Sequence, residues 1–264
     1  MSLTLIVNVY KITCKKCGAR MKIVNADSIE KLWLNLLIDV CCGENYFDHP
    51  VIFTRNTFAT TENFILDNEP LKDDFFKYSG YSYLHKMAQL RKEYYTGKVE
   101  KQYEVIKKYF HQYVPRQSRA AIYFSEPAFD KSSKLKCLES LYFQKYNKTE
   151  YEVFLVFRNT EIYPKLFMDF LYIKELIDEL DHYAKVNCIK FNGIIVNSFI
   201  NMHQSKLIDM LLKRWGVTKY SKNFLNVLVE FDRKFSFDRV KDIKLNSIKR
   251  VLERTYRLLE EDGT

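Results

Sequence analysis

The stretch from Ser118 to Arg158 constrains the fold more than any other part of the chain, because it contains three short apolar runs in succession. Each run, in AAIYF, LESLYF and EYEVFLVF, has the length and the aromatic or β-branched content of a strand. Arg119 opens the first run, Cys137 begins the second and Arg158 ends the third. We therefore expect two arginines and one thiol to meet at one edge of a sheet.

These residue types suggest a particular chemistry. Guanidinium groups bind phosphate or carboxylate through paired hydrogen bonds, and a nearby cation lowers the pKa of a thiol. Cys137 is therefore a candidate nucleophile beside an anion held by Arg119 and Arg158. The alternative is a half-buried strand cysteine with no chemical role.

The composition is that of a chain with a substantial core. Of the 264 residues, 47% are hydrophobic and 16% aromatic, and only 7 Gly and 5 Pro leave little room for linkers. We expect one domain over residues 1–264, with a variable strand and CxxC hairpin at 1–27 and a helix at 237–264. No run is apolar enough to span a bilayer and no signal peptide is recognised, so we expect a cytoplasmic protein without a membrane partner.

Charge and cysteine content narrow the ligand class. The net charge of +9 favours an anionic ligand, but the basic residues are mixed with acidic ones, so nucleic acid is not favoured.

Cys14 and Cys17 form a CxxC, and the other half of a zinc site could come only from Cys41 and Cys42. A hairpin turn with incidental thiols is the favoured alternative, so we predict no metal.

The pattern of apolar residues predicts a mixture of helices and strands. Helices are expected at 28–42, 83–95, 99–113, from about 164, at 204–215 and at about 237–259. Further strands are expected at 4–12, 51–66, 188–204 and near 224–231. His203 is interpreted as a helix-cap residue.

The spacing of the two arginines and the thiol also carries a resemblance. Cys137 follows Arg119 by 18 positions and precedes Arg158 by 21, which resembles the thymidylate synthase and pyrimidine-nucleotide hydroxymethylase family. The resemblance covers roughly Ser28 to Leu212. It implies a thymidylate synthase-like α/β (α+β) fold, with a large mixed β-sheet flanked by helices and a dimer formed through the face of the sheet.

In that family the cysteine adds to C6 of a pyrimidine, which lets C5 attack a one-carbon unit carried by a folate. The resemblance therefore makes Cys137 the nucleophile and 5,10-methylenetetrahydrofolate the donor. The family often has Pro-Cys-His, whereas Lys136 and Leu138 flank the cysteine here. The residues expected to bind the phosphate are Arg55, Arg116, Arg119, Arg158 and Asn159.

Two of these phosphate ligands correspond less directly to the family. Arg55 matches an arginine that lies on a mobile loop in the family, and a surface cation is an equal alternative. Ser118 stands where the first of two paired arginines is expected, and Arg116 would substitute for it.

Asp169 indicates which base is bound. It follows Arg158 by 11 positions, where synthases acting on uracil carry asparagine and relatives that hydroxymethylate cytidine monophosphates carry aspartate. A carboxyl group can accept from the N4 amino group of cytosine and, when protonated, donate to N3. The alternative is one more acidic residue on a helix.

Two further features of the family are matched only in part. Phe199 and Asn201 stand where the family holds the ribose hydroxyl, and only Asn201 can make that hydrogen bond. The glutamate that manages protons at the ring has no clear counterpart, and Glu93 and Glu62 are the candidates.

The sequence thus favours an enzyme that transfers a one-carbon unit to C5 of CMP or dCMP, as a homodimer. One alternative is a thymidylate synthase acting on dUMP, which Asp169 and the polar C-terminal residues argue against. The other is a catalytically silent nucleotide-binding or interaction module of the same fold, which Phe199 and Leu138 favour. The sequence does not separate a ribonucleotide from a deoxyribonucleotide substrate.

Overall fold

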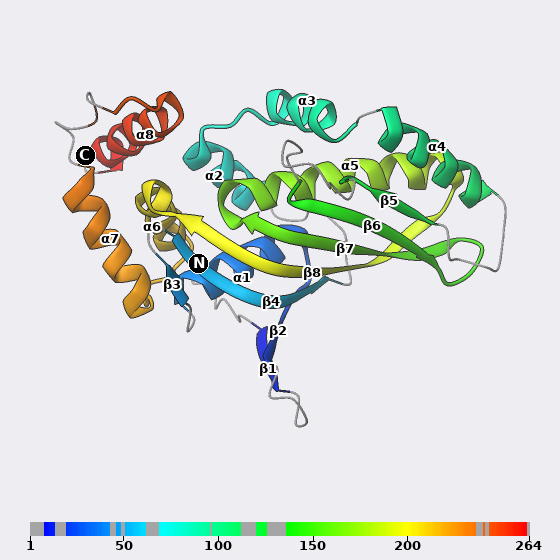
Figure 1. Cartoon of the computed structure of the whole chain (residues 1–264), viewed down its shortest axis with the longest axis horizontal. Helices are drawn as coiled ribbons and strands as arrows, with labels where there is room; N and C mark the ends of the chain where they lie inside the picture. The colour runs from blue at the N-terminus through cyan, green and yellow to red at the C-terminus, as the bar shows by residue number, and fades with distance from the viewer. Residues whose placement is uncertain are drawn as a thin grey trace.

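The computed structural model describes residues 8–13, 20–42, 46–48, 51–61, 69–95, 97–111, 120–125, 136–235, 240 and 243–262; for 8–13, 20–21, 46–48, 51–60, 69 and 262 it describes the backbone alone. The strands form an eight-stranded sheet in the order β1-β2-β4-β8-β7-β6-β5, with β3 beside β4 (Figure 1). Pairs β2–β4 and β7–β8 are parallel and the others antiparallel. The expected mixed sheet with flanking helices is therefore confirmed.

The strands are β1 (Asn8–Thr13), β2 (Arg20–Ala26), β3 (Tyr46–Asp48), β4 (Val51–Thr61), β5 (Ala121–Tyr123), β6 (Leu138–Lys145), β7 (Glu150–Glu161) and β8 (Asn187–Asn201). The three apolar runs between Ser118 and Arg158 form β5, β6 and β7, which are adjacent in the sheet. Cys14 and Cys17 lie outside the described residues, between the antiparallel strands β1 and β2.

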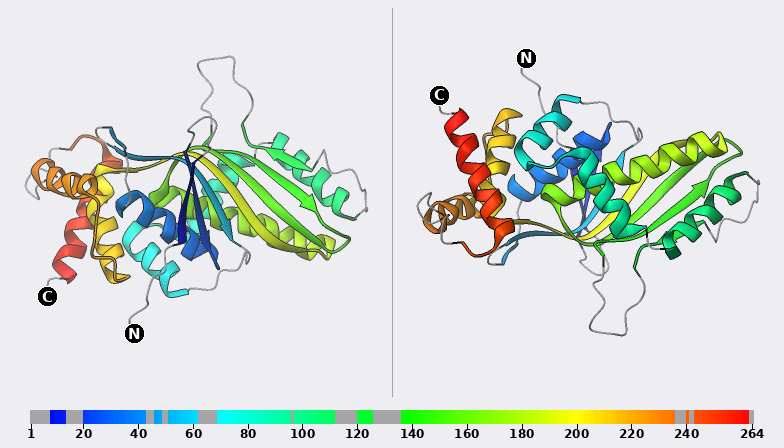
Figure 2. Two further views of the ribbon diagram at one scale, coloured as in Figure 1. Left: turned by 90° about the horizontal axis from the view of Figure 1, so that it is seen from below. Right: turned by 90° about the horizontal axis from the view of Figure 1, so that it is seen from above.

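The helices are α1 (Ile29–Cys42), α2 (Glu69–Ser79), α3 (Tyr83–Tyr94), α4 (Gly97–His111), α5 (Phe167–Ala184), α6 (Ser205–Arg214), α7 (Lys222–Lys234) and α8 (Asn246–Asp262), with a π-helical turn η1 (Ile162–Leu166) and a 3-10 turn η2 (Met202–Gln204). Seen from above, α3 and α5 lie in front of the strands, and seen from below the strands lie in front (Figure 2). The helices therefore cover one face of this part of the sheet. In the described part of the chain, no helix is both long and apolar enough to cross a membrane.

An aromatic cluster joins α1, α2 and α5. Trp33 is fully buried, and its ring lies 5.2 Å from Phe75 and 4.8 Å from Phe167, measured between centroids. The indole Nε1 donates to the carbonyl oxygen of Ile162 at 2.9 Å. Since Ile162 begins η1, this hydrogen bond fixes the segment that leads from β7 into α5.

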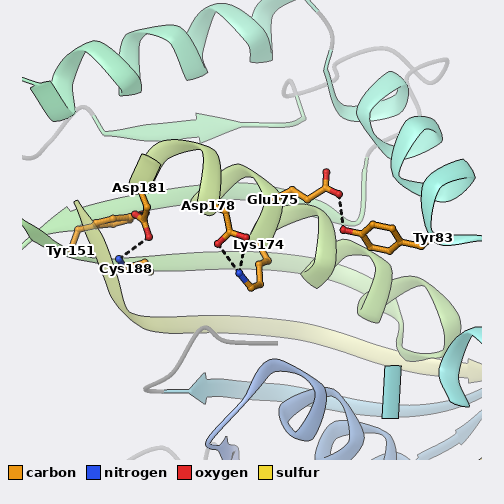
Figure 3. Close-up of polar contacts among 7 residues, drawn as sticks. All are labelled: Tyr83, Tyr151, Lys174, Glu175, Asp178, Asp181 and Cys188. Atoms are coloured by element: carbon orange, nitrogen blue, oxygen red, sulfur yellow. Dashed lines mark hydrogen bonds and ion pairs between the residues drawn. The ribbon is translucent and has the colours of Figure 1, made fainter. Parts of the chain in front are cut away.

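Helix α5 is the central helix of this layer and was correctly predicted to begin near Pro164. All eight positions expected to face inward are buried, namely Leu166, Phe167, Phe170, Leu171, Ile173, Leu176, Ile177 and Leu180. Polar contacts along its other side tie it to its neighbours (Figure 3). Asp181 accepts from the Tyr151 hydroxyl of β7 at 2.7 Å, and Glu175 accepts from the Tyr83 hydroxyl of α3 at 2.7 Å.

The C-terminal part differs from prediction in two places. The segment 224–231 is not a strand but part of α7, which begins where the Ser221 hydroxyl accepts from the backbone N–H of Phe224 at 3.2 Å. Its apolar residues are buried at helical spacing, as Phe224, Val227 and Phe231 show. Helix α8 begins at Asn246 and not near residue 237.

Candidate functional site

Cys137 lies immediately before β6 and is half-buried. Its carbonyl oxygen accepts a hydrogen bond from the backbone N–H of Arg158 in β7 at 3.0 Å. This bond follows from the β6–β7 register, in which Leu138 pairs with Phe157. Cys137 and Arg158 are therefore backbone neighbours, and the convergence of their side chains on one ligand stays a prediction; β7 continues beyond Arg158 to Glu161.

Asp169 lies in the first turn of α5 and is 3% exposed. Its Oδ1 accepts from the Tyr94 hydroxyl at 3.5 Å. Burial raises the pKa of Asp169 to about 7, against the lowering effect of Lys86 and Lys165. The carboxyl group is thus poised to be a donor or an acceptor near neutral pH.

Tyr94 links Asp169 to Cys137, and sequence reasoning missed it. Burial raises the pKa of Tyr94 most, followed by the charges of Asp169 and Cys137. The Lys136 ammonium lies 4.9 Å from the centre of the Tyr94 ring. A usable signal was the spacing of Met87, Leu90 and Tyr94, which form the buried stripe of α3.

The pKa of the Cys137 thiol is raised, whereas the sequence predicted that nearby cations would lower it. Burial is the largest cause, followed by the charge of Asp169, and Glu161 acts in the same direction. Lys165 and Arg158 oppose this shift without overcoming it. The thiol of the free protein is therefore held mainly in its protonated form at neutral pH.

A second polar group extends the site along the ends of β7 and β8. Glu161 is 3% exposed and pairs with Lys165 at 2.6 Å. The side-chain amide of Asn201 donates to Glu161 as well. Burial lowers the pKa of His203, and the charges of Glu161 and Lys165 act on this pKa in opposite directions. The helix-cap interpretation of His203 was wrong, because α6 begins after Gln204 without a side-chain cap.

The remaining predicted residues are more dispersed. Glu93 is exposed on α3, where its carboxylate accepts from Gln89 at 2.6 Å, and its role as proton handler stays a prediction. Asn159 is exposed on β7. Arg55 lies within β4, in the strand expected over this run, and pairs in register with Asn197; it is not on a loop like the family's arginine.

The side chain of Arg55 is not described, and Glu62, Arg116 and Arg119 lie outside the described residues. The convergence of Arg119 with the thiol therefore stays a prediction.

Of the thiols in the alternative metal site, Cys41 and Cys42 lie within the described residues. Cys41 is fully buried in α1, and burial raises its pKa well above the ordinary value, followed by the charge of Cys42. Within the described ranges, no group of three His, Cys, Asp or Glu side chains is arranged to hold a metal ion.

Comparison with known proteins adds no relative. No family model matches the chain, and no curated protein matches it. The geometry of Cys137, Tyr94, Asp169 and the Glu161–Lys165 pair therefore carries the functional argument.

Proposed function

We propose that this protein transfers a one-carbon unit to C5 of a cytidine nucleoside monophosphate, in the manner of a cytidylate hydroxymethylase with a thymidylate synthase-like fold. One observation carries the proposal: Tyr94 donates to the buried carboxyl of Asp169, and its ring lies 4.9 Å from the ammonium of Lys136, the residue before Cys137. These residues come from α5, from the start of β6 and from the end of α3. Their convergence provides a nucleophile beside a group suited to the edge of a base.

Asp169 favours cytosine over uracil. When protonated, its carboxyl group donates to N3 of cytosine while its other oxygen accepts from the N4 amino group. Uracil presents an N–H at N3 and a carbonyl at C4, which is the opposite pattern. A pKa of about 7 keeps the required protonated form available at neutral pH.

The reaction begins when the Cys137 thiol loses its proton and its sulfur forms a bond to C6, which leaves electron density at C5. Bound 5,10-methylenetetrahydrofolate would supply the methylene group to which C5 forms a bond. The proton at C5 and tetrahydrofolate would then leave, water would add to the methylene carbon and give up a proton, and the electron pair returned to C5 would expel the Cys137 thiolate from C6. Proton exchange at the ring stays assigned to Glu93 or Glu62, because Asp169 is engaged at N3 and N4.

A dimer through the sheet is part of the proposal. On the face opposite α5, Tyr142 of β6 is 37% exposed, and Ile194 and Val196 of β8 are 37% and 38% exposed. Val156 pairs with Ile194 in register and faces the same way, next to Tyr142 and its partner Phe154. An apolar sheet face of this kind is suited to pack against a second copy.

Two alternatives have their own support. A catalytically silent module is favoured by the raised pKa of Cys137 and by the exposed position of Glu93. A dUMP-specific synthase would need the Asp169 carboxylate to accept from N3–H, which its charged form allows.

Tritium release from C5 separates these three functions. We expect release from labelled CMP or dCMP in the presence of methylenetetrahydrofolate, and its loss in Cys137→Ser. Cys188→Ser is the matched control, since Cys188 is a half-buried cysteine at the far end of β8. Release from dUMP alone would indicate a synthase, and release from no nucleotide, together with no Cys137 adduct of a 5-fluoropyrimidine nucleotide, would indicate the silent module.

A further inference from the structure

Arg254 of α8 contacts the turn between α2 and α3, far away in the sequence. Its Nε donates to the carbonyl oxygen of Tyr78 at 3.3 Å, and its terminal nitrogen donates to the carbonyl oxygen of Lys77. Both carbonyls belong to the last turn of α2, where a helix leaves carbonyl groups unpaired and carries partial negative charge. The guanidinium group therefore caps α2 from a different element.

Gly80 allows this close contact. A Cβ atom on Gly80 would lie 2.8 Å from Cδ and 2.9 Å from Nε of Arg254, which is closer than real Cβ atoms come. The φ angle of Gly80 is +72°, which residues with a Cβ atom seldom adopt. The backbone of the turn is thus packed directly against the arginine side chain.

The turn leads into residues that face the candidate site. The Tyr81 ring lies 5.3 Å from the ammonium of Lys86. Burial raises the pKa of Tyr81, and the charges of Glu161 and Lys165 act on it in opposite directions. Lys86 in turn lowers the pKa of Asp169 against the effect of burial.

Tyr163 provides a second connection to the same arginine. It lies in η1 between Glu161 and Lys165 and is 1% exposed. Its hydroxyl is buried without a hydrogen-bond partner among the described residues. Burial raises the pKa of Tyr163, and the charge of Arg254 opposes this shift. The Tyr163 ring packs edge-on against Phe75 of α2, with centroids 5.9 Å apart, so the helix that Arg254 caps contacts η1 directly.

We infer that Arg254 is a positioning residue for the candidate site: it holds the α2–α3 turn against η1 and thereby sets where Tyr81 lies relative to the Glu161–Lys165 pair. The inference concerns the geometry of the site and does not require the proposed substrate. It also assigns a role to α8, which sequence reasoning treated only as a C-terminal helix.

The test compares Arg254→Ala with Arg250→Ala, which removes an exposed arginine one turn earlier on α8. Peptide-resolved hydrogen exchange reports on residues 81–90, and alkylation by iodoacetamide over a series of pH values reports the pKa of the Cys137 thiol. For Arg254→Ala we expect exchange at 81–90 to rise about tenfold while β7 and β8 stay protected. We also expect the Cys137 pKa to fall, because water would enter beside Glu161. Arg250→Ala should change neither readout.

Gly80→Ala separates positioning from stability. In the wild-type background the added methyl displaces Arg254 and should shift the Cys137 pKa in the same direction as Arg254→Ala. Combined with Arg254→Ala, the methyl meets no guanidinium group, so its additional effect on the thiol should be smaller than its effect alone. An unchanged Cys137 profile in Arg254→Ala would overturn the inference. So would a uniform rise in exchange across all strands, since Arg254 would then only stabilise the fold.

Discussion

The hydroxyl group of Tyr94 lies 3.5 Å from Oδ1 of Asp169, and this contact joins the end of α3 to the start of α5. Both side chains are buried, and the thiol of Cys137 lies close enough to each to affect its protonation. The hydrogen bond from Tyr94 lowers the pKa of Asp169, but burial raises it more, to about 7. The site thus combines a carboxyl that titrates near neutrality with a thiol whose pKa is raised above its ordinary value.

Replacement of Asp169 by asparagine should stabilise the protein above neutral pH. The folded-state pKa of about 7 lies above the ordinary value of 3.8. The stability contributed by the protonated carboxyl is therefore fully present below the unfolded pKa and is lost as pH rises through the folded pKa. The shift corresponds to about 4 kcal/mol as an upper bound. Urea unfolding of Asp169→Asn above and below this range measures the effect.

Asp178→Asn is the matched control for this measurement, because Asp178 is an exposed acidic residue of the same helix that pairs with Lys174. Its urea midpoint should differ little from that of the unmodified protein at either pH. If replacing Asp169 by asparagine changed the urea midpoint, relative to the unmodified protein, by the same amount in acidic and alkaline buffer, the carboxyl would not be buried as described.

The Cys137 thiol should react slowly with iodoacetamide at neutral pH, because burial and Asp169 raise its pKa. Asp169→Asn removes a neighbouring negative charge and should accelerate alkylation several-fold, whereas Lys165→Gln removes a positive charge and should slow it. Peptide mass spectrometry measures the rates. Cys188 is an internal standard, since burial raises its pKa to about 12 and neither substitution is near it. Equal rates in both variants would contradict the proposed arrangement.

Ile194→Lys should dissociate the proposed dimer, because it places a charge in the apolar outer face of the sheet, where Ile194 is 37% exposed. Analytical ultracentrifugation measures the effect as a change in mass. Val229→Lys is the control, since it adds the same charge at an exposed apolar position of α7. A monomeric unmodified protein at micromolar concentration would remove the dimer from the proposal.

The features that sequence predicted well are those encoded by local patterns. Helix α1 begins where Ser28 accepts from the backbone N–H of Lys31 at 3.3 Å, a cap that can be recognised from a few residues. The contact between Tyr94 and Asp169 spans 75 positions, and the helical spacing that marks Tyr94 as buried does not show which distant residue it contacts. Similarly, the pKa of Cys137 depends on which side chains bury it, and that depends on the tertiary structure.

The segment 224–231 was mistaken for a strand because its apolar residues also alternate over a short interval. A strand would direct Val227 and Val229 to the same face, since they are two positions apart. In α7 they lie on different faces, and Val227 is 1% exposed whereas Val229 is 68% exposed. The N-terminal cap at Ser221 favours the helix, which the periodicity alone did not reveal.

The helix assignment can be tested by making the same substitution, valine to alanine, at positions 227 and 229. Val227→Ala should destabilise the protein by about 2 kcal/mol, because it removes buried methyl groups and leaves a cavity. Val229→Ala should change stability by less than about 0.5 kcal/mol, because its side chain is solvated and alanine favours a helix. Thermal and urea unfolding measure both changes. Similar losses at the two positions would indicate that they share a buried face, as in a strand.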